Sequence, residues 1–120
     1  MEPRPLQPEE TAVIRVLLDH ADFDGRAELL AQVPTAKVVG RCGCGCATVE
    51  LAVDRAPADD AVPRPIPNQA TIFDEVGDPI GGVLLFAKDG CLAELEVYSF
   101  GKEPIATLPR PERLMLEVES

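Results

Sequence analysis

Apolar residues recur with the period of a helix in the first third of the chain. A helix is predicted over residues 9–20, where apolar residues fall on one side, and Pro8 suits its first turn. A second helix is predicted over residues 25–32, since Pro34 disfavours helical backbone at the residue before it. The apolar side of the first helix consists of Val13, Ile14, Leu17 and Leu18.

The pattern changes to the two-residue period of strands after residue 35. In residues 47–53, Val49 and Leu51 point to one face, and Thr48 and Glu50 point to the other. Residues 114–118 alternate as well, which is compatible with a last short strand. The main predicted strands are residues 36–41, 47–53, 70–76, 82–88 and 91–99.

The dipeptide Asp89-Gly90 is the strongest turn signal in the chain and predicts a two-residue hairpin. Direct pairing across this turn defines a core face and a second face that is half polar. The predicted core face pairs Phe86 with Ala93, Leu84 with Leu95 and Gly82 with Val97. The predicted second face pairs Leu85 with Glu94 and Val83 with Glu96.

Two helices followed by about five hairpin-connected strands predict an α+β fold. In this fold, the two N-terminal helices pack on one face of an antiparallel sheet. Residues 1–8 carry three prolines and are predicted to form a flexible arm. Residues 9–120 are predicted to form a single domain, in which the proline-rich segment 54–67 is an exposed loop.

Composition limits the classes of partner and the compartment. The chain has 120 residues and a net charge of −10, so the surface is acidic. Nucleic acids and anionic membranes both require a basic patch, which argues against both as partners. The N-terminus lacks an apolar export signal, and no apolar stretch approaches the ~20 residues of a membrane span. Together with the abundance of Arg, Ala and Pro, these features predict a cytoplasmic protein of a GC-rich bacterium.

Four cysteines carry the most distinctive local chemistry. Cys42, Cys44 and Cys46 alternate with glycines between two predicted strands, so their sulfur atoms can converge at a hairpin tip. Thiolates suit zinc, the candidate metal, and either Cys91 or His20 could supply a fourth ligand. Two other interpretations stay open: small residues packed in a glycine-rich turn, or thiol-based redox chemistry beside Arg41. In a reducing cytoplasm these thiols are not expected to form disulfides.

Other residues that could support catalysis fit no catalytic motif. His20 is the only histidine, and its acidic neighbours are explained by a solvated helix end. Ser99 and Ser120 are the only serines, and neither lies in a nucleophile motif. Glu94 and Glu96 share a face of their strand, as carboxylates on the solvated side of a sheet do.

Two segments carry a resemblance to a known group of proteins. They are Val39-Gly40-Arg41-Cys42-Gly43-Cys44-Gly45-Cys46-Ala47-Thr48-Val49 and Asp89-Gly90-Cys91-Leu92-Ala93-Glu94-Leu95-Glu96-Val97-Tyr98-Ser99-Phe100-Gly101. Over about residues 12–112 the chain resembles short uncharacterised proteins of GC-rich bacteria, to which no activity is assigned. The second segment is also similar to the C-terminal hairpin of small bacterial immunity-type proteins, which bind a partner without catalysis.

The sequence favours a non-enzymatic domain that interacts with another protein. This hypothesis rests on the lack of catalytic motifs and on a hairpin-built sheet with one half-polar face. The alternatives are a zinc-binding module that uses Cys42, Cys44 and Cys46 together with Cys91, and a small enzyme that uses a thiol of this cluster.

Overall fold

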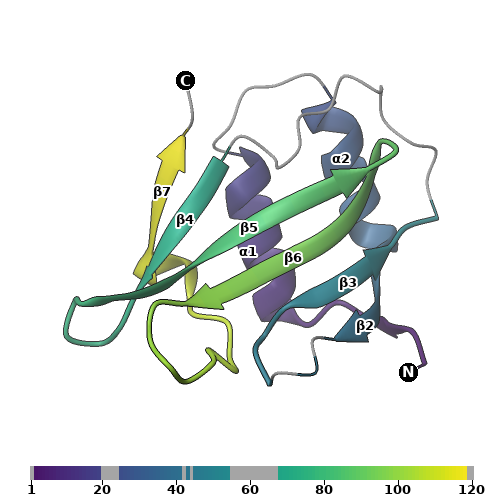
Figure 1. Cartoon of the computed structure of the whole chain (residues 1–120). Coiled ribbons are helices and arrows are strands. Elements are labelled where there is room, and N and C mark those ends of the chain that lie inside the picture. Colours follow the sequence, from purple (N-terminus) through teal and green to yellow (C-terminus); the bar gives the residue numbers. More distant parts are fainter. Residues whose placement is uncertain (1, 20–24, 42, 44, 55–67, 119–120) are drawn as a thin grey trace.

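The computed structural model describes residues 2–19, 25–41, 43, 45–54 and 68–118. This part of the chain forms two α-helices and one sheet of seven strands (Figure 1). The elements are β1 (Arg4–Pro5), α1 (Pro8–Asp19), α2 (Arg26–Gln32), β2 (Lys37–Arg41), β3 (Val49–Ala52), β4 (Asn68–Phe73), β5 (Pro79–Lys88), β6 (Cys91–Ser99) and β7 (Leu114–Val118). Short 3₁₀ turns lie at Val33–Thr35 and Pro111–Arg113.

All neighbouring strands in the sheet are antiparallel, in the order β1-β2-β3-β6-β5-β4-β7. The predicted α+β class is therefore confirmed. The predicted number of about five strands is too small, because β1 and β7 extend the sheet at its two edges; β7 is the possible last strand at residues 114–118. β1 has only two residues, which is too short for a two-residue period to be visible in the sequence. The predicted loop 54–67 lies outside the described residues, except for Asp54.

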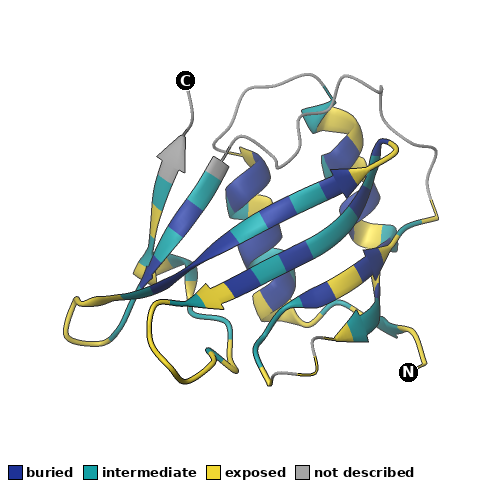
Figure 2. Ribbon diagram, in the orientation of Figure 1, coloured by how far each residue is buried: buried dark blue, intermediate teal, exposed yellow. Residues whose placement is uncertain are grey.

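Both helices lie on one face of the sheet, behind β5 and β6 in the view of Figure 1. The two predicted helices are confirmed, with α1 beginning at Pro8 and α2 at Arg26. Within the described residues, no helix is long and apolar enough to cross a membrane. The core between helices and sheet is visible as the dark-blue segments of Figure 2. Its largest fully buried apolar side chains are Ile14, Leu17, Leu18, Leu29, Ile72, Leu85, Leu92 and Leu95.

The β5–β6 hairpin has the predicted turn but a different register. Asp89 and Gly90 both have positive φ angles, 54° and 77°, as a two-residue hairpin turn requires. Lys88 then pairs with Cys91 as expected, but a bulge at Ala93 shifts all later pairs by one residue. The observed pairs are Phe86 with Glu94, Leu85 with Leu95, Leu84 with Glu96, Val83 with Val97 and Gly82 with Tyr98.

The bulge corrects the predicted core face. Leu95 and Val97 are buried as predicted, but Leu84 and Phe86 lie on the opposite face and are half-buried. Their places in the core are taken by Val83, Leu85 and Ala87. With the shift, apolar residues of β5 oppose apolar residues of β6, and this places all of them against the helices.

A buried amide holds the tip of this hairpin against α2. The Gln32 side chain is fully buried; its Nε2 donates to the Gly90 carbonyl at 2.9 Å, and its Oε1 accepts from the Leu92 N–H at 2.9 Å. The same side chain therefore satisfies one acceptor and one donor that the turn leaves inside the protein.

The N-terminal arm is joined to the domain at β1. Arg4 and Pro5 pair with β2, and the Arg4 guanidinium binds both carboxylate oxygens of Glu10 at 2.9 and 3.0 Å. Glu10 also accepts from the Gln7 N–H at 2.7 Å, which is the carboxylate half of a helix capping box. Whether the rest of residues 1–8 is flexible stays a prediction.

Candidate functional site

The two faces of the sheet have different surroundings. Alternate residues of β5 and β6 point to the helices and are buried, whereas the intervening residues point to the other face. No described helix lies on this second face, which we call the open face. The half-buried or exposed residues that β3, β5 and β6 place on it include Glu50, Leu84, Phe86, Glu94, Glu96 and Tyr98, with Ala52 and Lys88 near the far ends of β3 and β5.

Three glutamates of the open face lie on two neighbouring strands. Glu50 on β3 is directly opposite Glu94 on β6, and Glu96 follows on the same side of β6. Among the described residues, no lysine or arginine forms an ion pair with Glu50, Glu94 or Glu96. Burial raises the pKa of Glu94, and the charges of Glu96 and Glu50 raise it further. The face therefore carries an acidic stripe, which consists of these three residues.

Apolar side chains border this acidic stripe. Leu84 opposes Glu96, and Phe86 opposes Glu94, so β5 presents an apolar stripe immediately beside the acidic one. The Tyr98 ring lies across Gly82, where a side chain of any other residue would meet the ring and its hydroxyl. Tyr98 also packs against Phe100, with ring centroids 5.9 Å apart, and Phe100 is 60% exposed. The open face thus combines charge with accessible aromatic surface.

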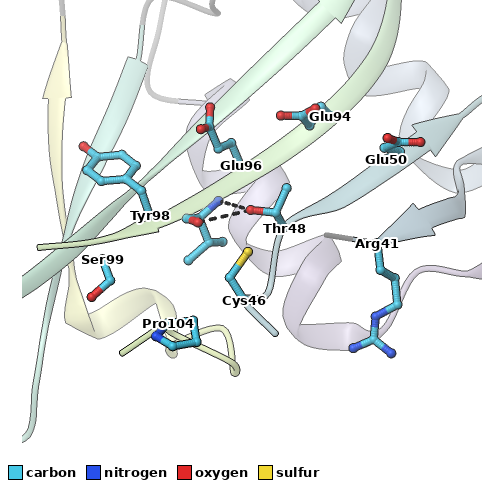
Figure 3. A pocket seen from close by; sticks show the side chains of 10 residues that line it. Arg41, Cys46, Thr48, Glu50, Glu94, Glu96, Tyr98, Ser99 and Pro104 are labelled. Atoms are coloured by element: carbon cyan, nitrogen blue, oxygen red, sulfur yellow. Dashed lines mark hydrogen bonds between the residues drawn. The ribbon is translucent and has the colours of Figure 1, made fainter. Parts of the chain in front are cut away.

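A hollow of about 510 Å³ runs along the acidic stripe: all three of its glutamates line the hollow, and so does Arg41 (Figure 3). In this view Glu50, Glu94 and Glu96 form a row that Tyr98 continues, while Ser99, Pro104 and Arg41 lie below the row. Between them, the Thr48 hydroxyl accepts from the Val97 N–H at 2.8 Å and donates to the Val97 carbonyl at 3.1 Å. Thr48 thereby extends the β3–β6 ladder with its side chain and leaves the carboxylates to face the hollow.

The structure does not bring the described cysteines together. Cys46 lines the hollow with Ser99 at the end of β6, whereas Cys91 is the first residue of β6. Thr48, two residues after Cys46, bonds to Val97, which is six residues from Cys91 along β6, or roughly 20 Å at ~3.3 Å per residue. One ion cannot be bound by both Cys46 and Cys91 at that separation.

The other predicted ligands cannot be placed in this site. Cys42, Cys44 and His20 lie outside the described residues, and a zinc site formed by the cluster stays a prediction. Cys46 and Cys91 are not in disulfides. Within the described part of the chain, no group of three or more His, Cys, Asp or Glu side chains is arranged to hold a metal ion.

The sequence indicated only part of this site. Alternation placed Thr48 and Glu50 opposite the buried Val49, and it placed Glu94 and Glu96 on one face; the structure confirms both arrangements. The sequence did not predict that Glu50 pairs with Glu94, because β3 and β6 are separated by about 40 residues of intervening chain. Tyr98 was missed because the direct register placed it beyond Gly82 instead of opposite it.

The arrangement is suited to binding and presents no nucleophile–base pair among the described residues. Unpaired carboxylates on a sheet attract cationic groups, and the adjoining apolar and aromatic side chains lose water when a partner covers them.

No protein-family model matches the chain, and no curated protein or solved structure is significantly similar to it.

Proposed function

We propose that the chain is a non-enzymatic protein-interaction module of the bacterial cytoplasm, and that the open face of its sheet binds the partner. The proposal is supported chiefly by the acidic stripe, in which Glu50 and Glu94 oppose each other and neither forms an ion pair with a described residue, although Arg41 lines the same hollow. Like charges placed directly opposite each other on paired strands destabilise a sheet. Retaining them at a cost in stability is understandable where they contribute to binding.

The apolar residues beside the acidic stripe support the same proposal. One solvated face is ordinary for an antiparallel sheet, but such a face is usually polar. Here Leu84, Phe86 and Tyr98 lie on it, and Met115 of the edge strand β7 is 59% exposed. Aromatic residues and Met are enriched in protein interfaces relative to other surfaces. Binding without catalysis agrees with the sequence, which holds no catalytic motif.

Affinity capture with two charge-reversed variants tests this function. Tagged wild-type protein, Glu96→Lys and Glu28→Lys would be expressed in the native host, and the bound proteins quantified by mass spectrometry. Both substitutions make the same chemical change, but Glu96 lies on the open face and Glu28 is an exposed residue of α2.

We expect a partner that is captured by the wild type and by Glu28→Lys, and is lost with Glu96→Lys. Thermal melts of the three proteins would first establish that all are folded. A partner that is lost only with Glu28→Lys would place binding on the helical side and contradict the proposal.

A further inference from the structure

We infer that the open face binds an amphipathic helix of the partner, basic on one side and apolar on the adjoining side, aligned along β6 and β5. This inference rests on the proposed function and specifies the chemistry of the partner. It is derived from the geometry of the two stripes, from their charge, and from the hollow that runs along the acidic stripe.

The two stripes run side by side along neighbouring strands. The acidic stripe lies on β3 and β6, and the apolar stripe, which consists of Leu84 and Phe86, lies on β5. Adjacent strands are ~4.8 Å apart, so three strands span ~10 Å, which matches the diameter of one α-helix. Leu84 and Phe86 are two residues apart, or ~6.8 Å along the strand, close to the ~6 Å rise between helix positions i and i+4.

A helix forms its backbone hydrogen bonds internally, whereas an extended segment laid on a sheet face has no partners for its backbone N–H and C=O groups. The N–H and C=O groups of a strand point toward its neighbours within the sheet, so the open face offers side chains to a partner and few backbone groups. An extended segment covering this face would bury unpaired backbone groups, each of which costs free energy. A helix laid on the face buries side chains and keeps its hydrogen bonds.

Charge complementarity selects a basic partner. The acidic stripe has no ion-pairing cation among the described residues, and the whole chain carries a net charge of −10. A second copy of the chain would bring its own acidic stripe against this one, which like-charge repulsion opposes. Lysine or arginine residues along one side of a helix would instead neutralise Glu50, Glu94 and Glu96 together.

The hollow beside Tyr98 gives the bound helix an anchor point. Its volume of about 510 Å³ exceeds that of one long side chain. Its lining holds three carboxylates and one guanidinium, those of Glu50, Glu94, Glu96 and Arg41, together with Tyr98 and Pro104. The carboxylate and the aromatic ring both favour a cationic group, the ring through its π face. We expect an arginine or lysine of the helix to occupy this hollow, between Glu96 and Tyr98.

A peptide titration followed by nuclear magnetic resonance tests the inference. The probe is a synthetic 18-residue helix with Lys on one side and Leu on the adjoining side. The comparison peptide has the same composition, with both residue types scattered around the helix. We expect saturable binding of the first peptide, with shift changes concentrated at Leu84, Phe86, Glu94, Glu96 and Tyr98, and weaker binding of the scattered peptide.

Matched variants separate charge from apolar contact. Removing the acidic stripe by E50Q/E94Q/E96Q should weaken binding by about ten-fold or more, since three exposed ion pairs are lost. The control E28Q/E75Q/E112Q removes the same number of exposed charges elsewhere and should change the affinity less than about two-fold. Leu84→Thr should weaken binding without changing its salt dependence. Circular dichroism and thermal melts would establish that each variant is folded.

Several outcomes would overturn the inference. Equal affinity for both peptides, or full displacement of the helix by spermine, would mean that the face recognises charge alone. Unchanged affinity in E50Q/E94Q/E96Q would remove the role of the acidic stripe. If the native partner is captured through the open face but its contacting segment is acidic or extended, this inference fails while the proposed function stands. If the native partner contacts α2 instead, the proposed function fails as well.

Discussion

Glu50 of β3 and Glu94 of β6 are directly opposed on the open face, and neither forms an ion pair with a described cation. Opposed residues have Cβ atoms only ~4.5–5.5 Å apart, so the two carboxylates repel each other and destabilise the sheet. We therefore predict that Glu94→Gln stabilises the protein by about 0.5 kcal/mol at pH 7. For a domain of this size, that corresponds to a rise of roughly 2–4 °C in Tm, which calorimetry would measure.

The pH dependence of this effect identifies its cause. The pKa of Glu94 is raised above 4.5 in the folded state, so its charge costs stability as the pH rises through that raised value. Below pH 4.5 the carboxyl group is largely protonated in both states, and the advantage of Glu94→Gln should vanish. Glu28→Gln serves as the control. A gain from Glu94→Gln that persists at pH 3 would show that packing, not charge, is responsible.

The Arg4–Glu10 pair should respond to acid in the opposite direction. Burial alone would raise the pKa of Glu10, but the hydrogen bonds from Arg4 and the Gln7 N–H outweigh it and lower the pKa below 4.5. A lowered pKa contributes stability that is present above pH 4.5 and is lost as the pH falls through the folded-state value.

We expect Glu10→Gln to cost about 1–2 kcal/mol at pH 7, because the charged hydrogen bonds with Arg4 are lost. The loss should shrink under acid conditions, in which the wild-type carboxyl group is also protonated. Urea unfolding at several pH values measures both effects. Glu9→Gln is the matched control, since Glu9 is the exposed neighbour of Glu10 in the same helical turn. An equal loss in both variants would mean that the helix dipole dominates and that the ion pair contributes little.

Among the polar residues of the fold, Gln32 should be the one whose substitution lowers the free energy of unfolding most. Gln32→Leu keeps the approximate volume but leaves the Gly90 carbonyl and the Leu92 N–H without their partner in the protein interior. We expect a loss of about 2–4 kcal/mol in the free energy of unfolding, because each buried unsatisfied group costs about 1–3 kcal/mol. Ala31→Leu, at the exposed neighbouring position of α2, should change stability by less than about 0.5 kcal/mol. Faster amide exchange at Leu92 in Gln32→Leu would locate the damage at the hairpin turn.

The cysteines can be tested by removing metal. Cys91 is the first residue of β6, whereas Cys46 precedes β3 and lines the hollow near the other end of β6, so Cys91 cannot complete a site that includes Cys46. We expect a chelator to leave Tm unchanged in protein purified without chelator, and Cys91→Ser to leave the metal content unchanged. Zinc that copurifies in a fixed ratio, together with a lower Tm after its removal, would instead establish a structural site at Cys42, Cys44 and Cys46.

The helices could be predicted because their pattern is unambiguous. In α1 the large apolar residues Val13, Ile14, Leu17 and Leu18 lie on the side that packs on the sheet, so period and burial agree. The hairpin β5–β6 is different. Every residue from 79 to 87 is apolar or glycine, so alternation does not indicate which side of β5 faces the core. The bulge at Ala93 then decides which residues enter the core, and no local signal in the sequence marks it.

The site depends even more on contacts between distant segments. Gln32 looks like an ordinary solvent-facing helix residue, yet it is buried because a turn 58 residues away in sequence reaches it. Glu50 and Glu94 each look like polar residues of a solvated face, and only the pairing of β3 with β6 brings their charges together. The polar residues that β3 and β6 place on the open face were therefore predicted, whereas the acidic stripe and the positions of Leu84 and Phe86 beside it were not.

The most direct test of the central claim is photo-crosslinking in the native host. A photoreactive amino acid would be placed at Leu84, in the middle of the open face, and in a second protein at Ala27, exposed on α2. The account predicts a discrete crosslinked product with a partner protein from position 84 and none from position 27. A partner crosslinked from position 27 but not from position 84 would contradict it.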